Sequence, residues 1–243
     1  SVLDFPLKDR LAKVFGHDNA GFEKLADALY LIDGPYQNPY ELMTFYDNHD
    51  MPRLDADDYG FINAHNWLFT ARGIPVIYYG SETGFMRGKA EHQGNRNYYG
   101  QERIDAGVSS PIYSNLKRIA QIRRENPALQ RGLQLNLLLD GKRAAFYRVY
   151  QHGESAQTAL VLLNKGSKPA KFSFSEKQLQ AGGWKSAISG NTYSIDSVKP
   201  SFKTEVPANG VEVLLFEGTL SSPALLTELN RLQAGKVRRT SGG

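Results

Sequence analysis

Short apolar runs alternate with helix-like patterns through the first half of the chain. The apolar runs have the length of strands and comprise residues 2–5, 42–46 and 74–79. Apolar residues recur with a helical period in three further segments, which are residues 19–32, residues 57–72 and a segment beginning at Pro111. Alternation of this kind is typical of βα units around a parallel sheet. The pattern therefore predicts three consecutive βα units within residues 1–128.

After residue 128 the pattern changes to short strands separated by turn residues. Residues 133–139 and 144–150 flank Asp140-Gly141, which predicts a hairpin with a short turn. The other strand-like runs are residues 158–164, 171–174, 184–188 and 211–216. About six to eight such strands predict an antiparallel β-sandwich domain over residues 129–218.

Residues 219–243 differ from both regions. They carry one weak amphipathic pattern, from Leu225 to Leu232, followed by a basic stretch. We interpret them as a linker or tail.

Composition and charge narrow the classes of protein to consider. The chain has 243 residues, of which 41% are hydrophobic and 22% charged, as in an ordinary folded protein. The absence of cysteine excludes disulfides, thiol catalysis and cysteine-ligated zinc. No apolar run approaches the ~18 residues of a membrane span, so we expect no membrane partner. The net charge of +4 comes mostly from residues 219–243, so we expect no nucleic-acid partner either.

Two polar clusters follow the second and third apolar runs. The first is residues 47–53 (DNHDMPR), and the second extends from Glu82 to Tyr99 and includes Asn95 and Arg96. Ligands of parallel α/β sheets and barrels bind at the carboxyl ends of the strands, where both clusters would lie. Carboxylates, amides, imidazole, guanidinium and exposed aromatic rings suit the recognition of sugars. From composition and spacing alone, capping turns and a solvated loop explain these clusters as well.

Three segments resemble the α-amylase family, glycoside hydrolase family 13. Residues 44–50 (TFYDNHD) resemble the family's signature at the end of the seventh barrel strand, and residues 73–82 (GIPVIYYGSE) resemble its eighth strand. Residues 2–7 are similar to its sixth strand. The resemblance implies an α/β fold followed by an all-β fold. Residues 1–128 would be the last three βα units of a TIM (β/α)8 barrel, and residues 129–218 an antiparallel C-terminal β-sandwich domain.

The resemblance also implies roles for five residues. Asp50 matches the family's third catalytic carboxylate, which stabilises the transition state, and His49 matches the imidazole that binds sugar hydroxyls. Arg53 is similar to the arginine that follows the motif in cyclodextrin-processing members and would bind substrate. Asn95 and Arg96 resemble a donor-side loop that also binds substrate, although residues 91–93 depart from its usual acidic pattern.

The nucleophile and the acid/base of this family lie on its fourth and fifth strands, and neither motif is found in this chain. Retaining cleavage needs both groups, about 5–5.5 Å apart. We therefore expect a C-terminal fragment of an enzyme that cleaves or transfers α-1,4-glucosidic bonds by a retaining mechanism. Alone it would be inactive. Its partners would be an α-glucan or cyclodextrin, together with the N-terminal half of the barrel or a second copy that covers its open strand edges.

Several points stay open at this stage. The alternative function is a non-catalytic carbohydrate-binding or interaction module, with the β domain as a structural support. Residues 51–53 and 94–96 favour cyclodextrin or maltooligosaccharide processing, as a hydrolase or a transferase, over a starch-liquefying amylase. No cofactor or metal site is identified in the sequence. The resemblance allows calcium in the complete enzyme and implies a secreted or periplasmic location.

Overall fold

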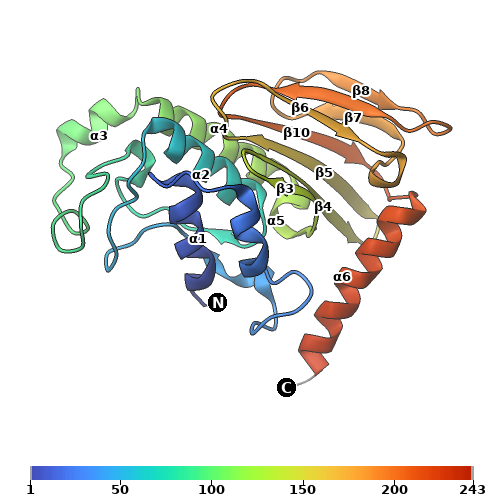
Figure 1. The fold of residues 1–243 in the computed structure, drawn as a ribbon, viewed down its shortest axis with the longest axis horizontal. Coiled ribbons are helices and arrows are strands. Elements are labelled where there is room, and N and C mark those ends of the chain that lie inside the picture. Colours follow the sequence, from blue (N-terminus) through green and yellow to red (C-terminus); the bar gives the residue numbers. More distant parts are fainter. Residues whose placement is uncertain (1, 242–243) are drawn as a thin grey trace.

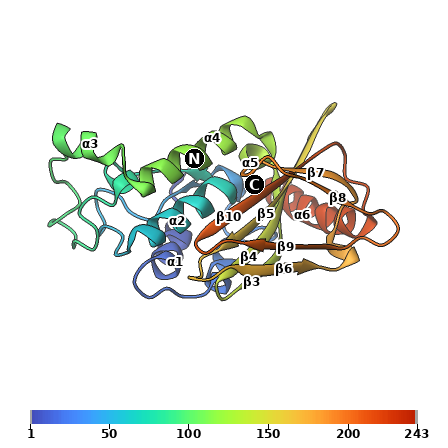
Figure 2. The same ribbon diagram turned by 90° about the horizontal axis from the view of Figure 1, so that it is seen from above.

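The structure, a computed structural model, describes residues 2–241, with side chains described through residue 235. Two regions lie side by side, one built of helices and short parallel strands and the other built on an antiparallel sheet (Figure 1). The view from above shows the same division, with the first half of the chain on one side and the sheet on the other (Figure 2).

A short parallel strand pair lies at the centre of the helical region. Strand β1 (Met43–Thr44) pairs in parallel with β2 (Ile74–Pro75), and Leu3 makes an isolated parallel bridge to Met43. All three segments fall within the predicted apolar runs, but each is shorter than its run. On the Leu3 side, the helix that begins at Phe5 ends the pairing. The extended residues that follow Thr44 therefore have no strand neighbour on that side.

Helices follow the three strand segments, as the alternating pattern predicts. They are α1 (Phe5–Phe15), α2 (Asp58–Thr70) and α4 (Pro111–Glu125). The Asp57 side chain caps α2 by accepting from the Gly60 N–H at 2.8 Å, and Ser110 caps α4 by accepting from the Ile112 N–H at 3.2 Å. Two short helices, α3 (Gln101–Gly107) and α5 (Pro127–Arg131), were not predicted.

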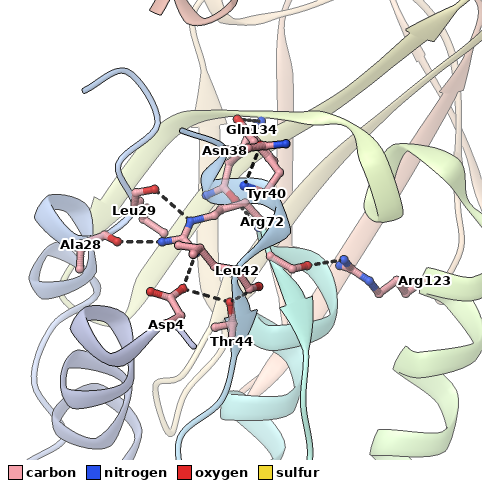
Figure 3. Close-up of polar contacts among 11 residues, drawn as sticks. Asp4, Ala28, Leu29, Asn38, Tyr40, Leu42, Thr44, Arg72, Arg123 and Gln134 are labelled. Carbon is pink, nitrogen blue, oxygen red and sulfur yellow. Dashed lines mark hydrogen bonds and ion pairs between the residues drawn. The ribbon is translucent and has the colours of Figure 1, made fainter. Parts of the chain in front are cut away.

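The helix predicted over residues 19–32 is wrong. The structure instead has a 3₁₀ helix, η1 (Phe22–Ala28), followed by Tyr30 at a φ of 50°. The buried guanidinium of Arg72 donates to the carbonyls of Ala28 and Leu29 at 2.8 and 2.9 Å (Figure 3). A longer helix would need these two carbonyls as acceptors, so the contact with Arg72 competes with helix propagation.

The second region is a six-stranded antiparallel sheet with a separate two-stranded sheet beside it. The order in the large sheet is β3 (Leu133–Asp140), β4 (Arg143–His152), β5 (Ser155–Asn164), β10 (Gly210–Glu217), β7 (Gly182–Ser186) and β8 (Thr192–Ile195). The small sheet pairs β6 (Ala170–Phe174) with β9 (Phe202–Val206). The predicted hairpin is confirmed, since β3 and β4 pair antiparallel and Gly141 takes a φ of 51° in the turn.

Alternate residues of the large sheet belong to two different cores. On β4, Ala144 and Phe146 pack with the helical region, whereas Ala145 and Tyr147 pack with the small sheet. Helix α6 (Pro223–Ser241) adds buried leucines to the second core. The helix predicted around Leu225 is thus present, and its assignment as a linker or tail stays a prediction.

Two buried arginines bond the backbone at the end of α2, and one of them, Arg148, links the two regions. Arg148 of β4 donates to the carbonyls of Thr70 and Ala71 at 2.7 and 2.5 Å. Arg123 of α4 donates to the carbonyl of Gly73 at 2.7 Å. These carbonyls lie at or just beyond the C-terminus of α2, where backbone acceptors lack helical partners. The sheet therefore helps to fix the helix that precedes β2.

Candidate functional site

The loops after β1 and β2 meet at the carboxyl end of the parallel strands. Asn95 Nδ2 donates to the carbonyl of His49 at 2.6 Å, and Arg96 Nε donates to the same carbonyl at 3.1 Å. The structure therefore joins the two polar clusters that the sequence places after separate strands. This is the edge at which parallel α/β structures bind ligands.

Asp50 is the carboxylate at the centre of this cluster. Arg96 Nη2 donates to Asp50 Oδ1 at 2.5 Å, and His49 Nε2 lies 3.0 Å from Asp50 Oδ2. The Asp50 N–H donates to Asn48 Oδ1 at 2.8 Å, which stabilises the turn. The side chains of Asp50, His49 and Arg96 are 60%, 56% and 62% exposed. A carboxylate, an imidazole and a guanidinium are thus adjacent and accessible to a ligand.

Arg53 lies under this surface and is 2% exposed. Its guanidinium donates to the carbonyls of Gly94 and Tyr79 at 2.9 and 2.7 Å, and it lies over the rings of Tyr78 and Tyr79 at 4.6 and 4.8 Å. One buried nitrogen, Nη2, has no partner in the described part of the chain. These contacts show Arg53 fixing the loop after β2, and its predicted contact with substrate stays a prediction.

Asn95 is also buried, at 0% exposure, and its contacts are within the protein. Its Oδ1 accepts from the His92 N–H at 3.0 Å while its Nδ2 contacts the His49 carbonyl. The Tyr78 hydroxyl donates to the Asn95 carbonyl at 2.8 Å, and burial raises the pKa of Tyr78, which keeps that hydroxyl protonated. Asn95 therefore presents Arg96 to Asp50.

Asp47 has a structural role that the sequence did not reveal. It is buried, and its carboxylate accepts from the Ser81 hydroxyl at 2.8 Å and from the Leu54 N–H at 3.3 Å. Burial raises the pKa of Asp47. Only the position of Ser81 just after the third apolar run, residues 74–79, could have signalled this contact. Of the two aspartates in the motif, Asp47 links the loops and Asp50 faces solvent.

An exposed tyrosine adds an aromatic surface to the loop after β2. Tyr98 is 86% exposed and lies two residues after Arg96. Aromatic faces pack on the apolar faces of ligands while their edges stay hydrated. Tyr98 is thus available to a ligand that reaches this edge.

No group of three or more His, Asp or Glu side chains among the described residues is arranged to hold a metal ion. None of the helices in residues 2–241 is long and apolar enough to cross a membrane.

Comparison with known proteins finds similar sequences and similar folds. No family model matches the chain. An α-amylase from Streptomyces lividans is 30% identical over 263 aligned positions, covering 92% of this chain and 28% of the relative. A cyclomaltodextrin glucanotransferase from Niallia circulans is 26% identical, covering 93% of this chain and 31% of the relative. The chain thus spans about three-tenths of the length of these curated relatives.

Solved structures agree with these relatives. A cyclomaltodextrin glucanotransferase with a three-domain ABC distribution has a TM-score of 0.71 at 29% identity, covering 90% of this chain and 45% of the other. The α-amylase from Geobacillus thermoleovorans, solved with acarbose, has a TM-score of 0.72 at 24% identity, covering 89% and 48%. The relatives and the solved structures together define the family of the chain. The chain belongs to the α-amylase family and resembles the cyclomaltodextrin glucanotransferases and cyclomaltodextrinases within it.

Proposed function

We propose that this chain is the C-terminal part of an enzyme that cleaves or transfers α-1,4-glucosidic bonds in starch, maltooligosaccharides or cyclodextrins. Residues 1–128 would supply the last three βα units of a (β/α)8 barrel, and residues 129–218 the β-sandwich domain that supports them. The parallel register of Leu3, β1 and β2 supports this reading, as do the helices that follow them. The α-glucan substrate is the one on which the named relatives act.

The observation that carries the proposal is the exposed Asp50 carboxylate at the carboxyl end of β1. Its two oxygens are contacted by Arg96 and His49, and more than half of its side chain faces solvent. A fixed carboxylate at this position stabilises the positive charge that develops on a sugar ring during glycoside cleavage. Asp50 would act in this way as the transition-state stabiliser.

The neighbouring residues divide into two groups by exposure. His49 and Arg96 are exposed and would contact hydroxyls of the donor sugar, which strengthens catalysis when the contact tightens in the transition state. Arg53 and Asn95 are buried and would act by holding the loops that carry Asp50 and Arg96.

Catalysis also needs a nucleophile and an acid/base, about 5–5.5 Å apart in a retaining enzyme. We propose that these carboxylates come from other barrel strands, supplied by another segment or polypeptide, and that the chain alone does not turn over glucan. The short parallel pair supports this requirement, because apolar side chains beside it are exposed. Val2, Leu3, Phe5 and Ile74 are each between 41% and 54% exposed. Further strands would cover such residues and pair with the open edges.

The test is a pair of matched substitutions in the enzyme completed by those strands. Asp50→Asn keeps the shape of the side chain and removes its charge, so we expect kcat to fall by about a thousandfold or more while glucan affinity changes little. Asp33→Asn is the control, since Asp33 is exposed and its side chain has no hydrogen bond or ion pair in the described chain. Near-normal turnover by Asp50→Asn would contradict the role assigned to Asp50.

The second candidate is a non-catalytic carbohydrate-binding module. Two observations favour it. Tyr98 is exposed beside the polar cluster, where it could bind a sugar ring. Among the described residues, Asp50 is the sole carboxylate bonded to His49 and Arg96, so the cluster holds one carboxylate and not the pair that cleavage needs. The two functions differ in outcome after the missing strands are supplied. Specific binding without any turnover in that completed protein would favour the module.

A further inference from the structure

A large cleft lies between the two regions of the molecule, away from Asp50. Its volume is about 1180 Å³. One wall is formed by the end of α1 and the start of α2, and the other by the β3–β4 turn, the β5–β6 loop and the residues before β10. None of His49, Asp50, Asn95 and Arg96 lines it. It is therefore a different site from the one described above.

Contacts between the walls hold the cleft open in a fixed shape. Lys165 of the β5–β6 loop donates to the carbonyl of Val14 at 2.9 Å, to Asn19 Oδ1 at 2.9 Å and to the carbonyl of Ala20. Across the floor, Asn63 Nδ2 of α2 donates to Asn209 Oδ1 at 2.9 Å. Side chains from both regions thus make up the walls before any ligand arrives, which lowers the ordering cost of binding.

Several lining side chains have no hydrogen-bond or ion-pair partner within the described residues and remain available to a ligand. Tyr59, on the first turn of α2, is 57% exposed. It has no hydrogen-bond or ring partner within the described residues. The same holds for the exposed side chains of His17, Asp55, Ser167 and Lys168, which also line the cleft. The cleft thus offers an aromatic face together with unoccupied donors and acceptors.

The charges in the cleft identify the class of ligand. The cleft is lined by three carboxylates and five cations, which are Asp55, Asp57, Asp140, Arg87, Lys142, Arg143, Lys165 and Lys168. Arg143 pairs with Asp140, Arg87 pairs with Asp58, and Lys165 bonds the opposite wall. An anion would therefore meet the carboxylates of Asp55 and Asp57, and a cation would meet Lys142 and Lys168. A neutral molecule rich in hydroxyls can donate to the carboxylates and accept from the ammonium groups at once. The volume exceeds the range of about 300–1,000 Å³ typical of pockets for single small molecules, which favours a ligand of several rings.

We propose that this cleft is a second binding site, for a neutral oligosaccharide, with a sugar ring packed on Tyr59. The oligosaccharide class follows from the lining residues alone. The choice of an α-1,4-linked glucan rests on the proposed function. A long glucan bound in this cleft would hold the protein on the polymer, while another part of the same polymer lies at Asp50.

The test uses the full chain labelled with ¹⁵N and titrated with maltoheptaose. We expect amide shifts at Tyr59, Ser167, Lys168 and Asn209 that saturate together. Tyr59→Ala should weaken this binding about tenfold, because the ring contact is lost, whereas Tyr59→Phe keeps the ring and should stay within about threefold. Tyr98→Ala is the control, since it removes an exposed tyrosine from the other site and should leave the cleft shifts unchanged.

Other results would overturn the proposal. Shifts confined to residues 48–50 and 95–98 would exclude the cleft as a glucan site and leave the proposed function standing. Binding of cellohexaose at the cleft, with none of maltoheptaose, would keep the oligosaccharide site but refute the α-glucan. Cleft shifts produced by inorganic phosphate and not by either sugar would refute the neutral class. An unchanged affinity in Tyr59→Ala would refute the sugar-packing role of its ring.

Discussion

The antiparallel sheet and the parallel strand pair differ in the length of their ladders and in how well their apolar side chains are buried. The β4–β5 ladder runs from Arg143 opposite Asn164 to His152 opposite Ser155, whereas the β1–β2 ladder has only the pairs Met43–Ile74 and Thr44–Pro75. The large sheet carries a core on each of its faces. The parallel pair leaves apolar residues such as Leu3 and Ile74 more than 40% exposed.

The large sheet is the stable part of the molecule, whereas the candidate functional site lies on the less stable parallel pair. Strands with both faces covered and long ladders provide their own stability, whereas a two-stranded pair does so only marginally. The exposed carboxylate Asp50 nevertheless follows the short pair. The molecule thus places its functional cluster on the region that depends most on neighbours, and four predictions probe that dependence.

The largest effect is expected from the two buried tryptophans. Trp67 of α2 packs against Phe22 and Phe146 in the core shared by both regions, and Trp184 of β7 packs against Tyr147 and Phe216 on the other face of the sheet. Truncating either to alanine should cost about 3–5 kcal/mol of unfolding free energy in urea. Hydrogen exchange should show that Trp67→Ala loosens residues 2–128 more than β3 to β5. An equal increase in hydrogen exchange in both regions would contradict the claim that the large sheet is the more stable of the two.

The next effect concerns the contact between the sheet and α2. Arg148→Met removes donors to the carbonyls of Thr70 and Ala71 and should cost about 2 kcal/mol, because buried acceptors lose their partners. Arg143→Met on the same strand is the control. Its guanidinium is partly exposed and contacts Asp140 at 3.5 Å, so the cost should stay below about 1 kcal/mol. Equal costs would show that Arg148 does not couple the regions.

A third effect should depend on pH. His65 of α2 is fully buried and its Nε2 lies 2.8 Å from the Tyr46 hydroxyl. Burial lowers the pKa of His65 from 6.5 to about 3, so between these values the unfolded chain binds a proton that the folded chain does not. Stability should therefore fall as the pH drops from 6.5 towards 3, with this residue contributing up to about 1.4 kcal/mol per pH unit.

Comparing unfolding curves of His65→Gln and the native chain between pH 3 and 7 measures this contribution. The variant should lose that part of the acid sensitivity. The control is His17→Gln, since His17 is exposed and its side chain has no hydrogen bond or ion pair in the described chain. A native slope retained in His65→Gln would show that His65 is not the group responsible.

The smallest effect on stability is expected at the site itself. Arg96→Gln breaks the exposed ion pair with Asp50 and should change the unfolding free energy by less than about 1 kcal/mol. In the completed enzyme it should raise KM for maltoheptaose more than it lowers kcat, if Arg96 positions the donor sugar. A loss confined to kcat would assign Arg96 to the transition state instead.

Local patterns predicted much of this fold. The β3–β4 hairpin follows from the turn residues Asp140-Gly141 between two strand-like runs, and α2 and α4 follow from a helical period, with Pro111 in the first turn of α4. The error at residues 19–32 arose because a distant side chain, Arg72, bonds the carbonyls of Ala28 and Leu29. Periodicity carries no information about such a contact.

The sequence also predicted part of the candidate site. The motif and the order of strands placed Asp50, His49 and Arg96 at one edge, where the structure joins them. Sequence could not tell that Arg53 is enclosed by the rings of Tyr78 and Tyr79, because burial depends on how the two loops fold over each other. The cleft beside Tyr59 could not be predicted either, because the contacts that join its walls connect residues 146 to 151 positions apart in the sequence.

The most direct test of the account is an assay of maltoheptaose cleavage by this chain before and after a polypeptide carrying the remaining barrel strands is added. We predict no turnover by the chain alone, turnover once the strands are supplied, and loss of that turnover in Asp50→Asn. Cleavage by the chain alone that persists in Asp50→Asn would contradict the claim that Asp50 completes an active site built with other strands.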